Sequence, residues 1–451
     1  MKDYKLTVGL EIHAELNTRT KMFCGSKNDP DEKRPNVNIC PICMGHPGTL
    51  PSINKEAVKS VLRLGIAING KIADYTEFDR KNYFYPDIPK GYQISQYKHP
   101  LVQGGELAGV KITRIHLEED TARSSHDKAM HSLVDFNRAG VPLLELVTEP
   151  VIKDPETASR FAKELQLVLN YLGIAEANME KGEMRVEANI SVSSGYKLGT
   201  KVEVKNLNSF KAVEKAIIYE RNRQIEILER GENVIQETRG FDENTGETFS
   251  QRAKEDSHDY RYFPDPDLPK LFINEIPDFS LEVLRKTLPE LPSQKRDRYK
   301  KTYNLKDTDI EIYIRSLNWS NFFEAVANKQ SDNNLIILSS NYITSELKKE
   351  IDVNEFCEVI KMIGDGEISS KGAKEILKEL QMRGGNARSI AIEKNVIQIS
   401  DHITLTQWVE EVIKEENKDA PIQYLVGQVI KKSQGKANPK IVFEIMTQKK
   451  V

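Results

Sequence analysis

Five segments in the first half of the chain alternate apolar and polar residues or are rich in β-branched residues. These segments are residues 6–16, 110–118, 143–147, 185–192 and 201–205. Successive side chains of an extended strand point to opposite faces, so a period of two is typical of strands with one buried face. The pattern predicts that the first part of the chain is rich in β-strands, with a few helices between them.

Two helices are predicted within this β-rich part. Residues 155–172 place apolar side chains three and four positions apart, with Asp154 and Pro155 at the start and Gly173 at the end. Aspartate before a helix, proline in its first position and glycine just after its end are helix-boundary signals. A second helix is predicted over residues 212–230 and ends before Gly231.

The C-terminal end of the chain predicts a small bundle of three helices. Apolar residues recur at helical spacing in three stretches, which are Leu405, Trp408, Val409, Val412 and Ile413, then Ile422, Leu425, Val426, Val429 and Ile430, and then Val442, Ile445 and Met446. Asn438 and Pro439 mark the start of the third helix. We expect these apolar stripes to form the core of the bundle, and the alternative is a groove for a partner.

Glycine and proline indicate where the β-rich part ends. Residues 1–290 hold 16 of the 19 prolines and 18 of the 25 glycines, and the remaining chain is helical in pattern. We therefore predict an α+β fold in three parts. They are a β-rich domain over residues 1–290, an all-α domain over 291–398 and the three-helix tail over 399–451.

Length and composition limit the class of protein. The 451 residues suffice for several domains with sizeable cores. With 39% hydrophobic and 29% charged residues and a mean hydropathy of −0.52, the sequence has no apolar run that fits a membrane span. No basic segment followed by an apolar one precedes the first strand, so we expect a cytoplasmic protein with no membrane partner.

Charge is unevenly distributed along the chain. The net charge of −3 excludes a general polycation. Residues 431–451, however, contain six lysines and the single acid Glu444. This basic tail is a candidate contact for nucleic acid, and the alternative is an ordinary solvated surface.

Acidic and histidine side chains share one face of the predicted strands. The group consists of Glu11, His13 and Glu15, then His116, Glu118 and Asp120 with Glu119 between them, then Glu145, and finally Arg185, Glu187, Asn189, Glu203 and Lys205. Glu145 lies in an otherwise apolar strand, where a carboxylate must be paired or metal-bound. Oxygen ligands suit Mg²⁺, so we expect a concave sheet whose polar face holds divalent cations and a polyphosphate. A structural Arg or Lys partner for Glu145 is the alternative.

Phosphate binding would depend on side chains. The sequence contains neither a P-loop nor a Gly-x-Gly-x-x-Gly motif, which disfavours a P-loop kinase and a Rossmann dehydrogenase. Residues 78–97 contain Arg80, Lys81 and Lys90 among aromatic residues that include Tyr83. This mixture suits phosphates and the stacking of a base or ribose, and the alternative is a rigid aromatic loop.

Three cysteines lie close in the sequence. Cys24, Cys40 and Cys43 offer three thiolates to Zn²⁺, but a closed structural site has four ligands, and Ser26 stands where a fourth thiol would be expected. The alternative is a reduced loop without metal. Elemental analysis showing less than about a tenth of an equivalent of zinc would decide for that alternative.

Taken together, the motifs resemble those of the B subunits of tRNA-dependent amidotransferases, the GatB/GatE family. The matching segments are residues 9–13, 78–96, 116–120, 137–145, 205–210 and 259–267, the last of which begins with Asp259. The resemblance extends over the whole chain and includes a C-terminal part similar to the YqeY-like tail. Residues 80–96 are its most specific segment.

The resemblance implies an ATP-dependent enzyme that amidates misacylated tRNA. The B subunit would bind Glu-tRNA(Gln) or Asp-tRNA(Asn) and phosphorylate the side-chain carboxylate of the attached amino acid. Ammonia that the A subunit releases from glutamine would then displace phosphate, within a heterotrimer that also contains a C subunit. The implied first domain is a cradle similar to the glutamine synthetase core, and the implied Mg²⁺ ligands are His13, Glu118 or Glu119, and Glu145, with Glu11 beside them.

The sequence departs from the family pattern at four positions. Arg123 replaces a usual Lys, Val151 and Glu187 each replace a usual Asp, and Ser26 replaces a frequent Cys. These departures leave open a diverged, non-catalytic tRNA-binding adaptor. A carboxylate–ammonia ligase acting on a small acid is a further alternative, although a small substrate does not require the helical extension.

Overall fold

The computed structural model describes residues 3–29, 31–126, 131–195, 197–253, 260–416 and 420–450. Asp259 of the resemblance motif lies outside the described residues. The chain divides into two compact units, Met1–Leu291 and Pro292–Val451. The first unit is a mixed α and β structure and the second is helical, so the α+β class is confirmed.

A ten-stranded sheet within the described residues forms the centre of the first unit. Its strand order is β15-β14-β13-β12-β1-β11-β8-β6-β2, and β7 pairs with β8. The five predicted strands are neighbours in it, namely β13 (Val202–Leu207), β12 (Met184–Ser193), β1 (Lys5–Glu15), β11 (Pro142–Thr148) and β8 (Val110–Glu119). The remaining members are β2 (Lys71–Ile72), β6 (Val102–Gln103), β7 (Glu106–Leu107), β14 (Glu237–Asp242) and β15 (Glu247–Ala253).

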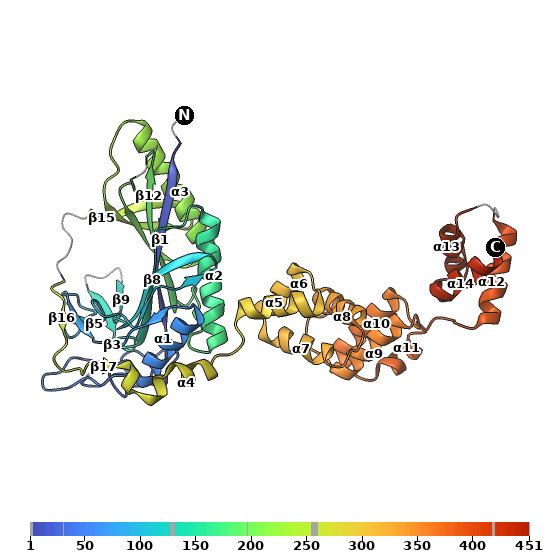
Figure 1. Ribbon diagram of the computed structural model, residues 1–451, viewed down its shortest axis with the longest axis horizontal. Coiled ribbons are helices and arrows are strands. Elements are labelled where there is room, and N and C mark those ends of the chain that lie inside the picture. Colours follow the sequence, from blue (N-terminus) through green and yellow to red (C-terminus); the bar gives the residue numbers. More distant parts are fainter. Residues whose placement is uncertain are drawn as a thin grey trace. The chain divides into compact units, whose positions relative to one another are not determined.

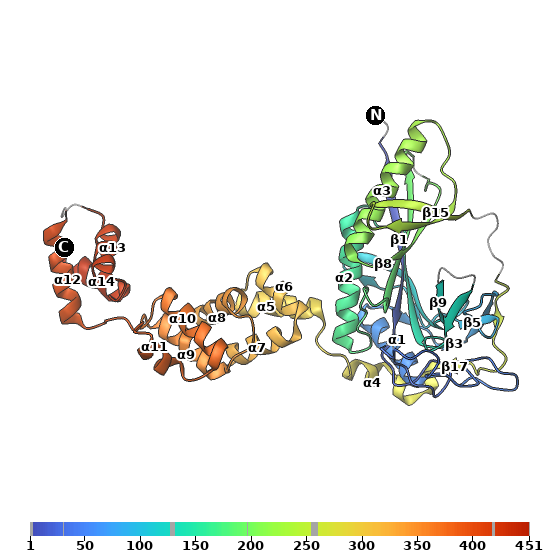
Figure 2. The same ribbon diagram turned by 180° about the vertical axis from the view of Figure 1, so that it is seen from behind.

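Helices cover one face of this sheet and short strands stand over the other (Figures 1 and 2). The helices are α1 (Lys55–Ala67), α2 (Pro155–Leu172) and α3 (Phe210–Glu229). The short strands form small sheets, β16-β4-β5 from Phe263–Pro264, Asp79–Asn82 and Tyr92–Ser95, β9-β10 from Arg123–His126 and Ser132–Asp135, and β3-β17 from Tyr75–Thr76 and Leu271–Phe272. A short helix, α4 (Leu281–Lys286), follows near the end of the unit.

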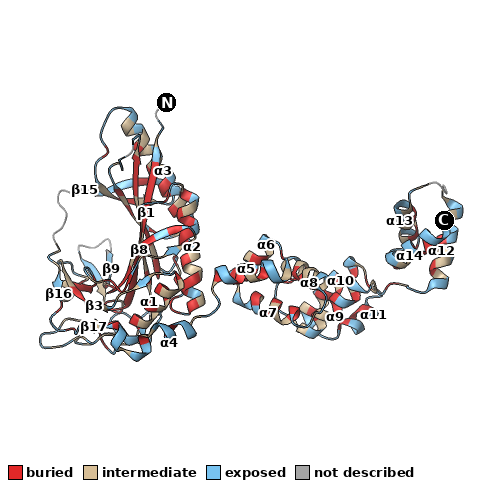
Figure 3. Ribbon diagram, viewed as in Figure 1, coloured by how far each residue is buried: buried red, intermediate tan, exposed pale blue. Residues whose placement is uncertain are grey.

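The apolar core lies between the sheet and the helices. Leu10, Ile12 and Ala14 of β1 are fully buried there together with Phe161 and Leu165 of α2. Figure 3 shows the buried residues along β1, β8 and α2. Because neighbouring residues of a strand point to opposite faces, the polar residues between these apolar ones face away from the core.

The helix-boundary signals of α2 act as predicted. Asp154 Oδ1 accepts a hydrogen bond from Thr157 N at 2.7 Å, Pro155 is the first helical residue, and Gly173 has the left-handed φ of 66° that ends the helix. The next helix, α3, begins at Phe210, two residues before the prediction. Its start is earlier because Ser209 Oγ caps the helix by accepting a hydrogen bond from Ala212 N at 3.0 Å.

The second unit consists of helices in the residues that the structure describes. They are α5 (Pro292–Tyr303), α6 (Asp307–Arg315), α7 (Leu317–Ala327), α8 (Asn333–Glu346), α9 (Val353–Gly364), α10 (Ser370–Arg383), α11 (Ala387–Glu393), α12 (His402–Glu415), α13 (Ile422–Lys432) and α14 (Pro439–Lys450). Buried residues of α12, α13 and α14, among them Leu405, Val429 and Val442, form one apolar cluster. The predicted stripes therefore form the core of this bundle.

Candidate active site

The strand register aligns charged and imidazole side chains in one row across four strands. His13 of β1 lies opposite Glu145 of β11 on one side and Arg185 of β12 on the other. Glu145 in turn lies opposite His116 of β8. Directly opposite residues of neighbouring strands share a face, so these four side chains share the polar face of the sheet.

Their charged atoms lie close together. His13 Nε2 is 3.5 Å from Glu145 Oε2 and 3.6 Å from Glu118 Oε1, and His116 Nε2 is 3.2 Å from Glu145 Oε2. Glu11 Oε1 is 4.0 Å from His13 Nε2. We name Glu11, His13, His116, Glu118 and Glu145 the carboxylate cluster. Arg114 NH2 also approaches Glu145 Oε1, at 3.4 Å, so an Arg partner for Glu145 is present as well.

The pKa values of two acids in the carboxylate cluster shift in opposite directions. Burial and like charge raise that of Glu11, whereas the neighbouring imidazoles lower that of Glu145. Burial and the charges of Glu145 and Glu187 raise the pKa of Glu11 to about 7. Burial acts to raise the pKa of Glu145, but His116 and His13 hold it well below its usual range. Burial acts to lower the pKa of His13, but its hydrogen bond to Glu145 and the charges of Glu118 and Glu145 raise it to about 9. Glu11 and Glu145 therefore ionise over different pH ranges although they belong to one cluster.

The donor set fits divalent cations. Three groups of side chains each bring ligand atoms within 4.8 Å of one another, and they are Glu11, His13 and Glu145, then His116, Glu118 and Glu145, and then Glu11, Glu187 and Glu203. Glu145 and Glu11 each belong to two groups, so adjacent cations would share a carboxylate. Asn189 Oδ1 and His116 Nδ1 are buried without a hydrogen-bond partner, so each strand offers a further unsatisfied polar atom.

Lysine and arginine side chains surround the carboxylate cluster. Lys205 Nζ lies 3.0 Å from Glu187 Oε2 and 3.8 Å from Glu203 Oε1. Arg185 NH2 lies 3.1 Å from Asp120 Oδ2. Burial acts to lower the pKa of Lys81, yet the charges of Glu118, Tyr262, Tyr83 and Glu145 raise it well above its usual value. Lys81 is therefore a protonated cation that faces the carboxylate cluster.

Three predicted site residues are paired with residues outside the carboxylate cluster. Glu119 forms an ion pair with Lys90 and accepts a hydrogen bond from Ile94 N at 2.9 Å, because its neighbour Glu118 takes the inward position on β8. The ammonium group of Lys90 is thereby already paired with a carboxylate. Arg80 Nε and NH2 are each 2.8 Å from an acid, Asp265 and Asp267 respectively, so its guanidinium is also already paired.

Tyr83 lies beside Lys81 on the small sheet. Its hydroxyl donates a hydrogen bond to Gln93 Oε1 at 3.1 Å, and Lys81 Nζ is 5.7 Å from the centre of its ring. Burial, the largest influence, raises the pKa of Tyr83 above its usual value. The phenol is therefore neutral near pH 7. Its hydroxyl donates a hydrogen bond, and its ring packs beside Lys81.

The three cysteines converge as the sequence predicts. Cys24, Cys40 and Cys43 place their sulfur atoms within 4.8 Å of one another, and Ser26 Oγ is 3.9 Å from Cys43 Sγ. Lys21 is fully buried, with Nζ 3.8 Å from Cys43 Sγ. The hydrogen bond between Cys24 and Cys43 lowers the pKa of Cys43 and raises that of Cys24. Three thiols match the soft ligands of Zn²⁺ but number one fewer than a closed site requires.

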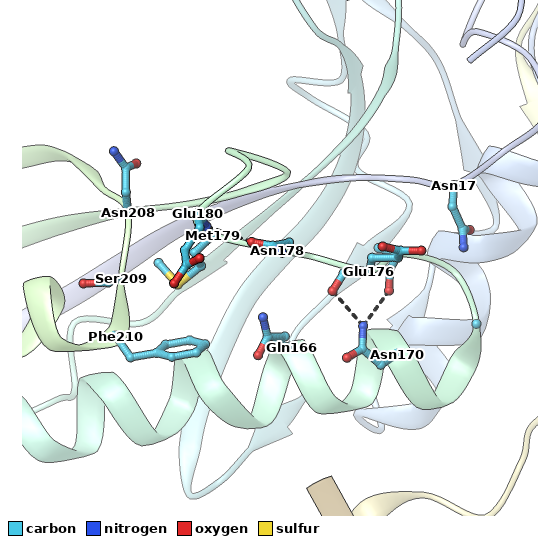
Figure 4. A pocket seen from close by; sticks show the side chains of 12 residues that line it. Asn17, Gln166, Asn170, Glu176, Asn178, Met179, Glu180, Asn208, Ser209 and Phe210 are labelled. Carbon is cyan, nitrogen blue, oxygen red and sulfur yellow. Dashed lines mark hydrogen bonds between the residues drawn. The ribbon is translucent and has the colours of Figure 1, made fainter. Parts of the chain in front are cut away.

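A separate cavity of about 710 Å³ lies at the end of α2. Figure 4 shows its lining, which consists largely of amide and hydroxyl side chains such as Asn17, Gln166 and Asn208. Asn170 Nδ2 donates hydrogen bonds of 2.8 Å to the carbonyls of Ala175 and Glu176, which holds the neighbouring loop in place. This cavity contains no member of the carboxylate cluster.

Two side chains near the carboxylate cluster were not predicted from the sequence. Arg114 was not singled out although it precedes His116 by two residues on the same strand, where the period of two places it on the same face. Tyr262 lies far away in the sequence, yet Glu118 and Glu145 are among the charges that act on its hydroxyl. The available signal was the resemblance motif over residues 259–267, which contains Tyr262 but does not indicate that its side chain reaches the carboxylate cluster.

The fold and the site define an α+β domain with a carboxylate-rich site on one face of its sheet, followed by helices. A sequence model described as the GatB/GatE catalytic domain matches residues 6–276, and one described as the GatB domain matches residues 321–449. Relatives from Thermodesulfovibrio yellowstonii and Caldanaerobacter subterraneus are 42% and 41% identical, each over 98% of both chains. Both are named as the B subunit of aspartyl/glutamyl-tRNA(Asn/Gln) amidotransferase. The chain belongs to the GatB/GatE family.

A further relative supports the same family. The protein of that name from Rippkaea orientalis is 42% identical over 99% of this chain and 97% of its own length. Of the helices in the described residues, none is both long and apolar enough to cross a lipid bilayer.

Proposed function

We propose that this chain is the B subunit of an ATP-dependent enzyme that amidates misacylated Glu-tRNA(Gln), Asp-tRNA(Asn) or both. The observation that carries this proposal is the row His116, Glu145, His13 and Arg185 across four strands, in a chain that matches named B subunits over nearly its full length. Such a row places cation ligands and cationic side chains on one rigid surface.

The proposed reaction has two steps. An oxygen of the tRNA-bound side-chain carboxylate attacks the γ-phosphorus of ATP, the bond to ADP breaks, and an acyl phosphate forms. Ammonia then attacks the carbonyl carbon, loses a proton, and inorganic phosphate leaves, so that the amide of Gln-tRNA(Gln) or Asn-tRNA(Asn) remains. The acyl phosphate makes an otherwise poor leaving group displaceable, and most of the catalysis consists of positioning and charge stabilisation.

The chain's residues have distinct roles in this proposal. Glu11, His13, Glu118 and Glu145 would hold Mg²⁺, with Glu187 and Glu203 beside Glu11. Mg²⁺ would neutralise the charge that develops on the transferred phosphoryl group. Lys81 faces the same carboxylates and supplies a protonated ammonium for phosphate oxygens. Arg80, Lys90 and Glu119 form ion pairs of their own, and their part in binding ATP or a metal stays a prediction.

The departures from the family pattern leave the carboxylate cluster intact. Arg123 and Val151 are exposed, and Glu187 still offers a carboxylate next to Glu11 and Glu203. The acid set therefore supports a catalytic subunit rather than the non-catalytic adaptor.

Several further assignments belong to the proposal. The resemblance implies a glutamine synthetase-like cradle over residues 1–290, a helical domain over 291–398, and a tail over 399–451 that binds tRNA. It also implies a cytoplasmic heterotrimer with a glutaminase A subunit and a C subunit. Zinc at Cys24, Cys40 and Cys43 is part of the proposal only if elemental analysis finds it.

The test is an amidation assay with the chain co-expressed with its A and C subunits. Misacylated Glu-tRNA and Asp-tRNA are supplied separately with ATP, and with glutamine or ammonia. We expect ATP cleavage coupled to formation of Gln-tRNA or Asn-tRNA. The misacylated tRNA that is amidated is then the substrate. Tight tRNA binding without ATP cleavage would instead support the adaptor.

A further inference from the structure

The small sheet β16-β4-β5 has one face toward the carboxylate cluster. Asp79 lies opposite Ser95 and Lys81 lies opposite Gln93, so these side chains share a face, whereas Arg80 and Ile94 share the other. Ser95 Oγ donates a hydrogen bond to Glu118 Oε2 at 3.2 Å. The face that carries Lys81 and Ser95 is therefore the one that borders the site.

A series of four neighbouring tyrosine rings begins at Lys81 on this side, and we name them the tyrosine box. They are Tyr83, Tyr97, Tyr260 and Tyr262. Lys81 Nζ lies 4.9 Å from the ring centre of Tyr260, whose ring is 5.8 Å from that of Tyr83 and 6.0 Å from that of Tyr262. The rings of Tyr97 and Tyr262 are stacked, with centres 4.2 Å apart and planes 7° from parallel.

Tyr97 forms the outer layer of this stack. One face of its ring is covered by Tyr262, yet Tyr97 is 58% exposed, so its accessible surface includes the opposite face of the ring. Neither Tyr97 nor Tyr262 belongs to the apolar core between the sheet and the helices. A flat aromatic surface held in place by a second ring and placed near a lysine suits a nucleobase and its phosphate.

The chemistry of the substrate limits how far its terminal base lies from the reacting carboxylate. The reacting carboxylate belongs to an amino acid esterified to the ribose of the terminal nucleotide of the tRNA. When that carboxylate reaches the carboxylate cluster, the terminal base must lie within the length of one amino acid and a ribose. The adenine of ATP is separated from its reacting phosphorus by a chain of similar length, so the KM values for tRNA and for ATP, rather than reach, distinguish the two bases.

We infer that the outer face of Tyr97, backed by Tyr262, stacks on the terminal base of the aminoacyl-tRNA and so positions the esterified side chain at the carboxylate cluster. This inference rests on the proposed function. Unpaired terminal nucleotides are well suited to such recognition because their bases are free to stack on aromatic side chains.

The kinetic test uses the assembled amidotransferase with Tyr97→Ala, Tyr97→Trp and Phe263→Ala. Phe263 is a matched control, because it is exposed on the same small sheet but lies opposite Arg80, on the other face. We expect Tyr97→Ala to raise the KM for misacylated tRNA by about 5- to 150-fold, the usual effect of losing one stacking partner, and to leave the KM for ATP unchanged. Tyr97→Trp should restore tRNA binding, and Phe263→Ala should match the wild type.

A binding test separates this inference from the proposed function. The probe is a tRNA that ends in the fluorescent base 2-aminopurine, whose emission falls when it stacks. We expect quenching by the wild-type complex and by Tyr97→Trp, and recovery of emission with bound Tyr97→Ala. An unchanged KM for tRNA, a KM that rises for ATP instead, or quenching that survives in Tyr97→Ala would overturn the inference. Absence of amidation by the wild type would overturn the proposed function, while the quenching still tests the stacking.

Discussion

Glu145 is the residue on which the charges of the site converge. Atoms of His116, Arg114 and His13 lie 3.2, 3.4 and 3.5 Å from its carboxylate oxygens, and each comes from a neighbouring strand. Burial alone would favour a neutral acid, but His116 and His13 hold the pKa of Glu145 well below its usual range. Glu145 therefore stays ionised at neutral pH, as a cation ligand must.

Replacing Glu145 with Gln should abolish amidation without unfolding the chain. The amide keeps the shape of the side chain but removes the charge that a cation would share between two ligand groups. We expect the rate of ATP-dependent amide formation to fall by at least about 100-fold, in the range found when one charge-stabilising group is removed. The measurement is amide formation by the assembled complex.

A second reaction of the same complex is the control. Glutamine hydrolysis, which we place in the A subunit, should survive Glu145→Gln. The exposed Glu106 on β7 provides a matched substitution, and Glu106→Gln should amidate like the wild type. Retained amidation in Glu145→Gln would contradict the role of Glu145.

At the scale of elements, α2 shows how a local signal determines a helix start. Asp154 accepts hydrogen bonds from the backbone N and the hydroxyl of Thr157, at 2.7 and 2.9 Å. The bond from the backbone N satisfies one of the donors that the first turn of a helix leaves without partners.

Asp154→Ala should destabilise the first unit by about 1 kcal/mol, the usual cost of removing such a cap. Unfolding by urea, followed by circular dichroism, measures the change. Glu156→Ala is the matched control, because Glu156 is exposed in the same turn and should change stability by less than about 0.5 kcal/mol. Equal effects of the two substitutions would show that the cap contributes nothing specific.

In the second unit, Glu324 joins α5 to α7. Its Oε1 lies 2.6 Å from Arg298 NH2, 2.7 Å from the Tyr299 hydroxyl and 3.3 Å from Lys295 Nζ. Burial acts to raise the pKa of Glu324, but hydrogen bonds from Arg298 and Tyr299 and the charge of Lys295 lower it overall. The folded state therefore favours the ionised form of Glu324 more than the unfolded state does.

This shift has a definite pH dependence. A carboxyl group whose pKa is lowered by folding stabilises the protein above its unfolded pKa, and that contribution is lost as pH falls through the lowered value. We expect Glu324→Gln to be less stable than the wild type at pH 7, with a difference that shrinks below about pH 4.5. Urea unfolding of the full chain at several pH values measures this. The exposed Glu350→Gln serves as control, and a pH-independent difference would contradict the prediction.

At the scale of the whole molecule, the chain combines a catalytic unit with a helical unit that ends in a basic segment. The bundle α12–α14 has its own apolar cluster. Residues 431–451 carry six lysines and one acid. Local positive charge on a folded module is typical of a contact with the phosphates of nucleic acid.

Deleting residues 399–451 should separate tRNA binding from catalysis. We expect the assembled complex to lose tRNA affinity, and the salt dependence of its remaining binding to weaken, because fewer phosphates are contacted. ATP hydrolysis should be retained because the carboxylate cluster lies in the first unit. Affinity measured at several salt concentrations provides the test. Unchanged tRNA binding would show that the basic tail is only a solvated surface.

The sequence by itself determined those features whose causes are local. Asp154, Pro155 and Gly173 bound α2 because capping and left-handed backbone act within one turn. The alternation around Glu11 and His13 predicted their shared face, because a strand has a period of two whatever its neighbours are. The apolar stripes of α12–α14 likewise indicated one bundle core.

Only the tertiary structure decided which of these faces meet. The period of two separates Glu118 from Glu119 in the sequence, but only the pairing of β8 with β11 brings Glu118 to His13 and leaves Glu119 to Lys90. Arg80 is neutralised by Asp265 and Asp267, and Tyr97 is backed by Tyr262, in both cases by residues more than 150 positions away. The physical reason is that local periodicity determines how side chains alternate, whereas strand order and long-range packing determine what each side chain contacts.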